Sequence, residues 1–206
     1  MIDTHNIEDA IPEQETGSKS DTHHAVTADS LEESKHLFIK VRERLQDVNN
    51  WHHWGGKASA IFKLTDEQGN EVNRKAKEGD HFKIKLPAPG SEAGEGFDWV
   101  VVEKIEDKSN PAGESEAFAI RVRPAQNPQK PDNEIAHFFK EDATSSFAVQ
   151  REKKKVTASV HGRNEKPNTE TEGLLDKARN ALVALGAMAG LSNPQWKSLV
   201  KGIVEE

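Results

Sequence analysis

The longest helical pattern in the chain, Thr169–Gly190, places the strongest constraint on what this sequence can fold into. Its apolar residues recur every three or four positions and so form one stripe along a helix face. The stripe consists of Leu174, Leu175, Ala178, Ala181, Leu182, Leu185 and Ala189. Because several of these side chains are small, we expect the helix either to approach a sheet closely or to leave a cavity beneath it.

Before this helix, short segments alternate between apolar and polar residues, as strands with one buried face do. The expected antiparallel strands, about seven in number, are Lys57–Thr65, Glu71–Ala76, His81–Leu86, Phe97–Glu106, Glu116–Arg123, Ala143–Gln150 and Lys155–Gly162. A weaker strand is expected at His23–Thr27. Such a sheet buries one face, and the long helix is the expected cover for that face.

A shorter helical pattern begins at Ser30, and an aromatic corner follows it. Ser30 and Glu33 have the spacing of a capping box, which predicts the start of the helix. Trp51 and Trp54 lie three residues apart, as on one helical turn, and a pair of glycines ends that turn. We expect this corner to be buried between the first helix and the sheet.

The charge balance and the missing residue types exclude several classes of protein. The chain of 206 residues has a net charge of −7, whereas a general nucleic-acid binder needs an excess of Lys and Arg. It contains no cysteine, which excludes disulfides, thiolate metal sites and a cysteine nucleophile. No apolar run approaches the roughly 20 residues that span a bilayer, and the N-terminus lacks the apolar region of a secretory signal. We therefore expect a cytoplasmic protein with no nucleic-acid partner and no integral membrane segment.

The order of elements resembles the helix-grip fold of the START-like superfamily, which includes Bet v 1-like proteins, polyketide cyclases and lipid-transfer domains. The resemblance lies in that order and in the position of Trp51 and Trp54 after the first helix. It implies an α+β fold in which a curved antiparallel sheet of about seven strands grips a long C-terminal helix around an apolar cavity. We expect a disordered acidic tail over residues 1–22 and a single START-like domain over residues 23–206, including an extra helix at about 193–205.

The cavity implied by this resemblance would be lined by inward side chains of the sheet and of the long helix. The candidate ligand-binding residues are Phe62, Phe82, Trp99, Glu103, Phe118, Phe147, Ala178, Ala181, Leu182 and Leu185. Glu103 shares a strand face with Trp99; if that face is inward, burial would raise the pKa of the carboxyl and suit it to acid–base work. The alternatives are that Val100 and Val102 face inward, or that Glu103 pairs with an arginine.

Other clusters of chemically active residues give weaker signals. The doublets His23-His24 and His52-His53 resemble metal ligands, but adjacent strand residues point to opposite faces. Ser145, Ser159 and His161 supply residue types for nucleophilic catalysis without the motif that positions a nucleophile. We therefore predict no catalytic residue, no metal site and no cofactor.

Three functions remain open on the sequence alone. The resemblance favours non-catalytic binding or transport of a small apolar or amphipathic molecule. A cyclase or aromatase would instead use an inward acid or base on a bound substrate. A scaffold or interaction protein would have a filled core and no cavity large enough for a ligand.

Overall fold

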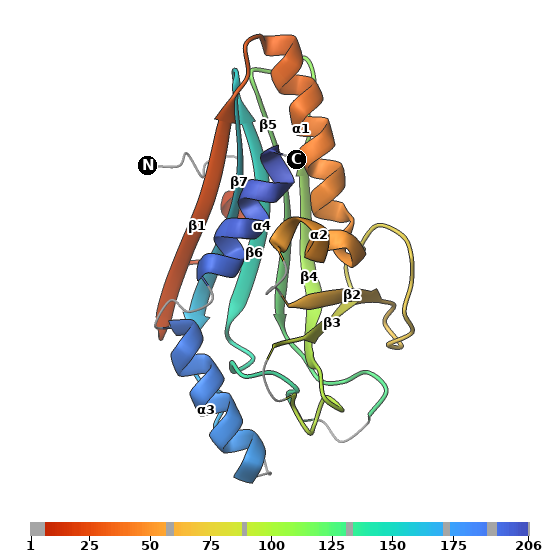
Figure 1. Ribbon diagram of the computed structural model, residues 1–206, viewed down its shortest axis with the longest axis vertical. Coiled ribbons are helices and arrows are strands. Elements are labelled where there is room, and N and C mark those ends of the chain that lie inside the picture. Colours follow the sequence, from red (N-terminus) through yellow and green to blue (C-terminus); the bar gives the residue numbers. More distant parts are fainter. Residues whose placement is uncertain are drawn as a thin grey trace.

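Seven strands form one antiparallel sheet in the order β1-β7-β6-β5-β4-β3-β2 (Figure 1). The computed structural model describes residues 7–56, 60–87, 90–130, 134–170, 174–188 and 193–205. The strands are β1 (Ser18–Thr27), β2 (Ile61–Thr65), β3 (His81–Lys85), β4 (Asp98–Lys108), β5 (Ser115–Pro124), β6 (Thr144–Glu152) and β7 (Lys155–Glu165). The helical elements are η1 (Glu8–Ala10), α1 (Leu31–Gln46), η2 (Val48–Asn50), α2 (Trp51–Gly55), α3 (Leu174–Met188) and α4 (Asn193–Glu205). Strands β2 to β7 are neighbours in sequence order, and β1 forms the edge of the sheet beside β7.

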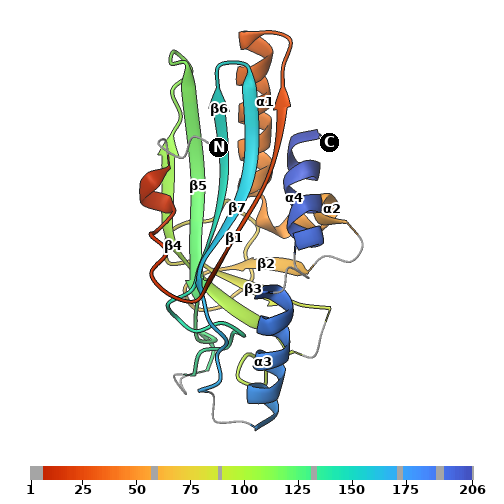
Figure 2. The same cartoon turned by 90° about the vertical axis from the view of Figure 1, so that its left-hand side faces the viewer.

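The sheet is curved, and helices α1 and α4 lie on its concave side while η1 lies on the convex side (Figure 2). Alternation along the strands sends one set of apolar side chains into the concave side. Phe118, Ile120, Val149 and Val156 belong to this set, and they pack in one core with Phe38 and other apolar residues of α1. The α+β architecture predicted from the sequence, a curved antiparallel sheet that grips a C-terminal helix, is confirmed.

Helix α1 begins at the predicted capping box. The backbone N–H of Glu33 donates to Ser30 Oγ at 3.1 Å, and the Glu33 carboxylate accepts from the backbone N–H of Asp29 at 2.9 Å. These bonds satisfy two backbone donors at the helix start and fix where the apolar stripe of α1 begins. Val41 and Leu45 of that stripe are buried on the sheet.

The predicted aromatic corner is confirmed as a structural element. Trp51 is 1% exposed, and its ring lies 4.7 Å from that of Phe147 and 5.2 Å from that of Phe62, measured between centroids. Its indole Nε1–H donates to the carbonyl of Leu45 at 3.0 Å, so its single polar group is satisfied in the core. The corner therefore joins the end of α1 to the concave face of the sheet.

The helix gripped by the sheet is α4, and this differs from the expectation that Thr169–Gly190 covers it. Helix α4 contacts β1, β7, α1 and α2, and its buried residues belong to the main core. Gly202 makes this approach possible, because a Cβ at that position would lie 2.4 Å from the carbonyl oxygen of Trp54. Helix α3 lies beyond one end of α4 instead (Figure 1). Among the described residues, no helix is both long and apolar enough to cross a membrane.

Helix α3 turns its polar side toward the protein, so the predicted apolar stripe does not cover the sheet. Leu175 is 71% exposed and Leu182 is 74% exposed. The side chains of Leu174 and Leu185, and all of Ala189, lie outside the described residues. Asp176, Arg179 and Asn180 are buried instead. A polar inner face explains why the stripe alone did not predict where this helix packs.

The N-terminal segment is packed on the convex face, which contradicts a disordered tail for residues 7–22. Ile7 and Ala10 are fully buried against small residues of β5 and β6 (Ala117, Ala119 and Ala148). The backbone carbonyl of Ala10 accepts a hydrogen bond from Ser146 Oγ. Residues 18–22 then form the first half of β1. Small side chains on the sheet leave room for this segment, and the composition of the segment gave no sign of that.

One predicted strand is also largely absent. Residues 71–76 make a single bridge, between Glu71 and Thr65, in place of a strand paired along its length. Arg74 and Asp80 form an ion pair across the following turn, with 2.8 Å between Nη2 and Oδ1. The segment is therefore held by side-chain bonds more than by a β-ladder.

Candidate functional site

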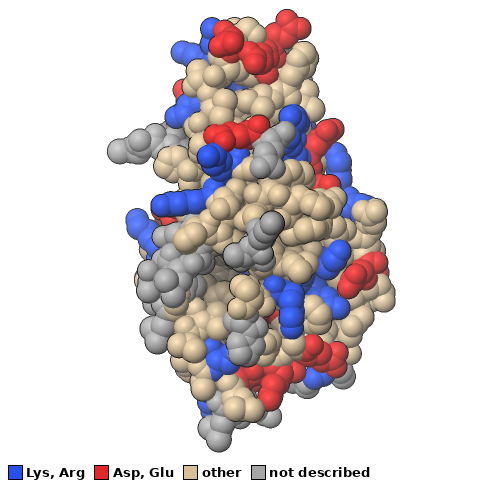
Figure 3. Space-filling model, viewed as in Figure 1, with Lys and Arg blue, Asp and Glu red and all other residues tan. Residues whose placement is uncertain are grey.

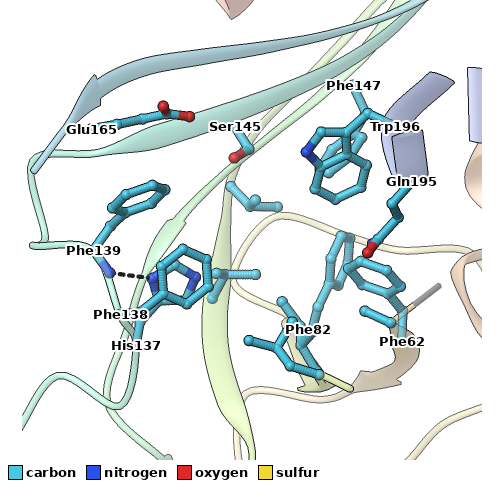
Figure 4. Close-up of a pocket in the computed structure, with 15 residues that line it drawn as sticks. Phe62, Phe82, His137, Phe138, Phe139, Ser145, Phe147, Glu165, Gln195 and Trp196 are labelled. Carbon is cyan, nitrogen blue, oxygen red and sulfur yellow. Dashed lines mark hydrogen bonds between the residues drawn. The ribbon is translucent and has the colours of Figure 1, made fainter. Parts of the chain in front are cut away.

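A pocket opens in the concave face between the sheet and the first turn of α4 (Figure 4). The cavity has a volume of about 100 Å³. Six aromatic side chains line it, namely Phe62, Phe82, Phe138, Phe139, Phe147 and Trp196. Five aliphatic side chains complete the apolar wall, namely Ala60, Ile84, Leu86, Val100 and Val122. The remaining lining residues are His137, Ser145, Glu165 and Gln195.

The pocket exists because the two covering helices fill different parts of the concave face. Helix α1 contacts β6 and β7, where the core is filled by its apolar stripe. Helix α4 sends Trp196 from its first turn toward β2 and β6, with ring centroids 6.2 Å from Phe62 and 5.6 Å from Phe147. These edge and tilted contacts leave the faces of several rings open to the space between them (Figure 4).

Glu165 forms a polar corner at one side of the pocket. Its carboxylate lies over Gly162, where a Cβ would come within 2.0 Å of Glu165 Oε1, so only glycine leaves room for it. Ser20 Oγ donates to Oε1 at 3.1 Å, and Ser18 Oγ lies 3.4 Å from Oε2. Burial raises the pKa of the Glu165 carboxyl, and the bonds from Ser20 and Ser18 partly oppose that rise. The corner is therefore built from β1 and β7 together.

His137 supplies a neutral imidazole to the same lining. Its Nδ1 accepts a hydrogen bond from the backbone N–H of Phe139 at 3.0 Å, so the neutral ring carries its proton on Nε2. The ring stacks on Phe138 with 4.2 Å between centroids. Burial lowers the pKa of His137 from 6.5 to about 4, and the ring is therefore uncharged at neutral pH.

The charge of the lining is one-sided. Glu165 is its single carboxyl, and the lining contains neither lysine nor arginine among the described residues. Ser145 lies opposite Gly162 in the β6–β7 ladder, next to the Glu165 corner. Within the described part of the chain, the hydroxyl of Ser145 and the side-chain amide of Gln195 make no hydrogen bond to protein. The arrangement can hold an apolar body and offer hydrogen bonds to an uncharged polar group.

Three of the ten predicted ligand-binding residues, Phe62, Phe82 and Phe147, line the pocket. Phe118 lies in the same core but under α1, beside the guanidinium of Arg42. On α3, Ala178 and Leu182 are exposed and Ala181 is half-buried, and none of the three lines the pocket. The side chain of Leu185 lies outside the described residues.

Trp99 and Glu103 lie on the opposite face of β4 from Val100 and Val102, on the side of the sheet away from the pocket. Trp99 packs with Ala93 and Ala136, and its indole Nε1–H donates to the carbonyl of Gly94 at 3.3 Å. Glu103 accepts from Arg121 Nε at 2.7 Å and from Arg123 Nη2 at 2.6 Å. An irregularity in the β4–β5 register at this position admits both contacts. An inward catalytic Glu103 is therefore wrong, and the alternative of an arginine-paired carboxylate is confirmed.

Several lining residues had no clear signal in the sequence. The run Ile135–Phe139 is a short apolar patch outside any strand, and three of its side chains enter the lining. Glu165 follows a residue with a left-handed backbone, Asn164 at φ 56°, which breaks the alternation that would place it. Trp196 lies on the helix that was predicted as an extra element. The sequence signal available for it was a tryptophan in the first turn of an amphipathic helix.

Ser159, His161 and Asp21 are joined by hydrogen bonds on the convex face. His161 Nδ1 lies 2.6 Å from Asp21 Oδ1, and Nε2 lies 3.0 Å from Ser159 Oγ. Ser159 and His161 are buried, and the backbone of β7 is paired with β1 on one side and β6 on the other. An acyl-transfer site needs free backbone donors beside its nucleophile, and this ladder leaves none in place for that role. The network is best described as a structural clamp between β1 and β7.

The histidine doublets are separated from one another and from acidic clusters. His24 Nε2 contacts Glu205 of α4 at 2.7 Å, and the rings of His52 and His53 lie 4.1 Å apart on α2. Within the described ranges, no group of three or more His, Asp or Glu side chains is arranged to hold a metal ion.

The fold and the pocket together define the class of protein: an α+β protein of helix-grip architecture, with an apolar pocket between the sheet and its C-terminal helix. No protein-family model matches the chain, and no curated protein matches its sequence. Similar solved structures include an uncharacterized protein from Bacillus thuringiensis, 12% identical with a TM-score of 0.41, covering 91% of this chain and 100% of that one.

Two further similar structures carry more descriptive names. Ara h 8.0201 is 11% identical with a TM-score of 0.36, covering 92% of this chain and 100% of that one. The di-domain ARO/CYC protein BexL is 11% identical with a TM-score of 0.39, covering 91% of this chain and 50% of that one. Similarities at this level do not show the function of this chain.

Proposed function

We propose that this protein binds a small apolar or amphipathic molecule, without covalent chemistry, in the pocket between the sheet and α4. The observation that carries the proposal is the mismatch between the two halves of the concave face. Under α1 the side chains of the sheet are covered by an apolar stripe, whereas under the start of α4 six aromatic side chains surround open space. Protein interiors are normally close-packed, so an aromatic-lined void of this kind suits a ligand better than it suits a filled core.

The polar groups of the lining support an amphipathic ligand over a purely apolar one. Ser145, Gln195 and the Nε2–H of His137 offer hydrogen bonds without carrying charge. Uncovered polar groups in an apolar pocket are satisfied by water or by a ligand that presents matching atoms. A carrier or sensor role needs no further catalytic group.

The test is a pair of substitutions that add the same volume at two places on the concave face. Val122→Phe adds a ring to the pocket wall, and Val149→Phe adds one to the filled core away from the pocket. We expect Val122→Phe to abolish binding of an apolar fluorescent probe while changing the free energy of unfolding by less than about 1 kcal/mol. Val149→Phe should cost about 1–3 kcal/mol through overpacking and leave probe binding intact.

The result that would overturn the proposal is equal destabilisation by both substitutions together with no probe binding by the unmutated protein. That outcome would favour the filled-core scaffold. Native mass spectrometry of protein purified from its own source gives an independent measurement, because a retained small molecule would be seen directly.

The second candidate function is an enzyme of the cyclase or aromatase kind. The observation that favours it is that two ionisable residues, Glu165 and His137, line one pocket, and burial shifts the pKa of each toward its uncharged form. A protonated Glu165 would act as a general acid on a bound carbonyl compound. Recovery of a chemically altered ligand after incubation with the protein, and of the unaltered ligand with Glu165→Gln, would support the enzyme over the carrier.

A further inference from the structure

Among the described residues, the lining of the pocket contains one carboxyl group and neither lysine nor arginine, and this restricts the charge of what can enter. Two cations that lie close in sequence to lining residues form ion pairs with other carboxylates. Lys140 pairs with Glu170, and Arg163 pairs with Asp21 on the convex face at 2.8 Å. A ligand carboxylate or phosphate would therefore lose its water without meeting a positive partner.

Glu165 strengthens this exclusion of anionic ligands. Its carboxylate is fixed over Gly162 by the two serine hydroxyls of β1 and has no arginine or lysine within ion-pair distance among the described residues. If ionised, it repels an anion; if protonated, it offers a hydrogen bond to a neutral oxygen. The ionised state favours a hydroxyl, which can donate to it, over a carboxylate, and the protonated state can donate to a hydroxyl or a carbonyl oxygen.

The other polar groups agree in their chemistry. Ser145 Oγ both donates and accepts, Gln195 does the same through its amide, and the neutral His137 ring donates from Nε2. The set matches an uncharged oxygen function that accepts and donates hydrogen bonds. The six aromatic rings match a flat apolar body attached to it.

We infer that the ligand of this pocket is an uncharged amphipathic molecule with a hydroxyl or carbonyl head, such as an alcohol, phenol or ketone, and that Glu165 selects against carboxylates and phosphates. This inference rests on the proposed function, since it concerns the same pocket. It goes further by excluding fatty acids and acyl phosphates from the ligand class and by assigning the selection to one residue.

The experiment compares two probes that share a ring system and differ only in the head group. 2-Naphthalenemethanol and 2-naphthoate are titrated into the full chain at pH 7.5, and binding is followed by calorimetry. We expect the alcohol to bind at least about tenfold more tightly than the carboxylate. Equal affinities, or tighter binding of the carboxylate, would overturn the inference while leaving the proposed function in place. Absence of binding by both probes would overturn the two together.

Two substitutions then test the assignment to Glu165. Glu165→Gln keeps one acceptor oxygen for the serine hydroxyls, replaces the other oxygen by an amide NH2 and removes the charge, so the advantage of the alcohol should shrink about tenfold through better carboxylate binding. Gln195→Lys, on the half-buried first turn of α4, supplies the missing cation and should shift the preference in the same direction without disturbing the Glu165 corner. Glu43→Gln on the exposed side of α1 is the control for net charge and should leave the ratio unchanged.

The two substitutions together keep the assignment falsifiable. A Glu165→Gln protein that folds, as judged by its melting temperature, and retains the full preference for the alcohol would show that Glu165 does not select. If that variant fails to fold, an unchanged ratio in Gln195→Lys would overturn selection by charge in this pocket, because a cation there should have attracted the anion.

Discussion

Helices α3 and α4 follow one another in the chain, but they attach to the protein by opposite kinds of interaction. Helix α4 buries Leu199, Val200, Ile203 and Val204 in the main core. Helix α3 buries Asp176, Arg179 and Asn180, adds one small apolar contact through Ala184, and leaves two leucines in solvent. Figure 3 shows an uncharged area near the middle of this face, with charged side chains around it and toward both ends of the molecule.

The polar anchorage of α3 consists of a small number of specific bonds. The Asp176 carboxylate accepts from the backbone N–H groups of Glu92 at 3.0 Å and Ala93 at 3.2 Å. Arg179 Nη1 donates to Asp98 Oδ1 at 2.9 Å, and a second bond joins the same two groups. Asn180 donates to the carbonyl of Asn168 at 3.0 Å. Apolar burial is additive and tolerant of small shifts, whereas such bonds depend on each partner being present.

The largest expected effect is the loss of one partner of the Arg179–Asp98 pair. Arg179→Ala leaves the Asp98 carboxylate buried without its guanidinium, which should cost about 3–5 kcal/mol in the free energy of unfolding. The double variant Arg179→Met with Asp98→Leu should recover most of that loss, because no charge is then left unpaired. Denaturant unfolding measures both, and a double variant as unstable as the single one would show that the pair contributes more than charge compensation.

The matched substitution on α4 should destabilise the protein by removing buried apolar volume. Ile203→Ala removes a fully buried side chain from the main core and should cost about 2–5 kcal/mol by leaving a cavity. This loss should not change with salt concentration, because no charged group is removed. A marked salt dependence of the effect in urea unfolding would contradict the assignment of α4 to apolar attachment.

Acid should destabilise the fold through His137, which lies close to the Arg179–Asp98 pair that anchors α3. The pKa of His137 is about 4 in the folded protein and 6.5 as its ordinary value, so the unfolded chain binds a proton over this range while the native ring does not. The contribution of His137 to stability is therefore fully present above about pH 6.5 and is lost as the pH drops toward 4, by about 3 kcal/mol. His137→Gln, which keeps an acceptor for Phe139, should show a shallower fall over that window. An identical slope in both proteins would mean that other groups cause the acid sensitivity.

The smallest expected effect is on the exposed side of α3. Leu182→Ala removes a side chain that is 74% exposed and should change the free energy of unfolding by less than about 0.5 kcal/mol. Thermal unfolding by circular dichroism is sufficient to measure it. A loss above about 1.5 kcal/mol would mean that this leucine is covered in solution and that the contrast between the two helices is smaller than described.

The sequence predicts local elements well where one residue decides them. Ser30 and Glu33 placed the start of α1, Trp51 placed the corner, and alternation identified Phe62, Phe82 and Phe147 as inward. In each case the deciding contact is close in sequence or follows from the two-residue period of a strand.

The packing of α3 could not be predicted, because its partners are distant in sequence. An apolar stripe shows that a helix is amphipathic, but the helix packs by whichever face has partners. Asp176 and Arg179 find theirs in the loop at residues 91–93 and at Asp98, more than 80 positions earlier. Likewise, no pattern marks Gly162 as the residue whose missing side chain makes room for Glu165.

The position of β1 beside β7 has a consequence for how the chain is made. Asp21 lies opposite His161, 140 residues later, so β1 has no strand partner until nearly the whole sheet has been synthesised. The hairpins β2–β3, β4–β5 and β6–β7 can close locally, but the first strand must wait through a loop closure of that length. An unpaired strand during synthesis is an aggregation hazard. The sequence of β1, Ser-Lys-Ser-Asp-Thr-His-His-Ala-Val-Thr, is polar through most of its length, and this composition keeps the waiting strand soluble until β7 arrives.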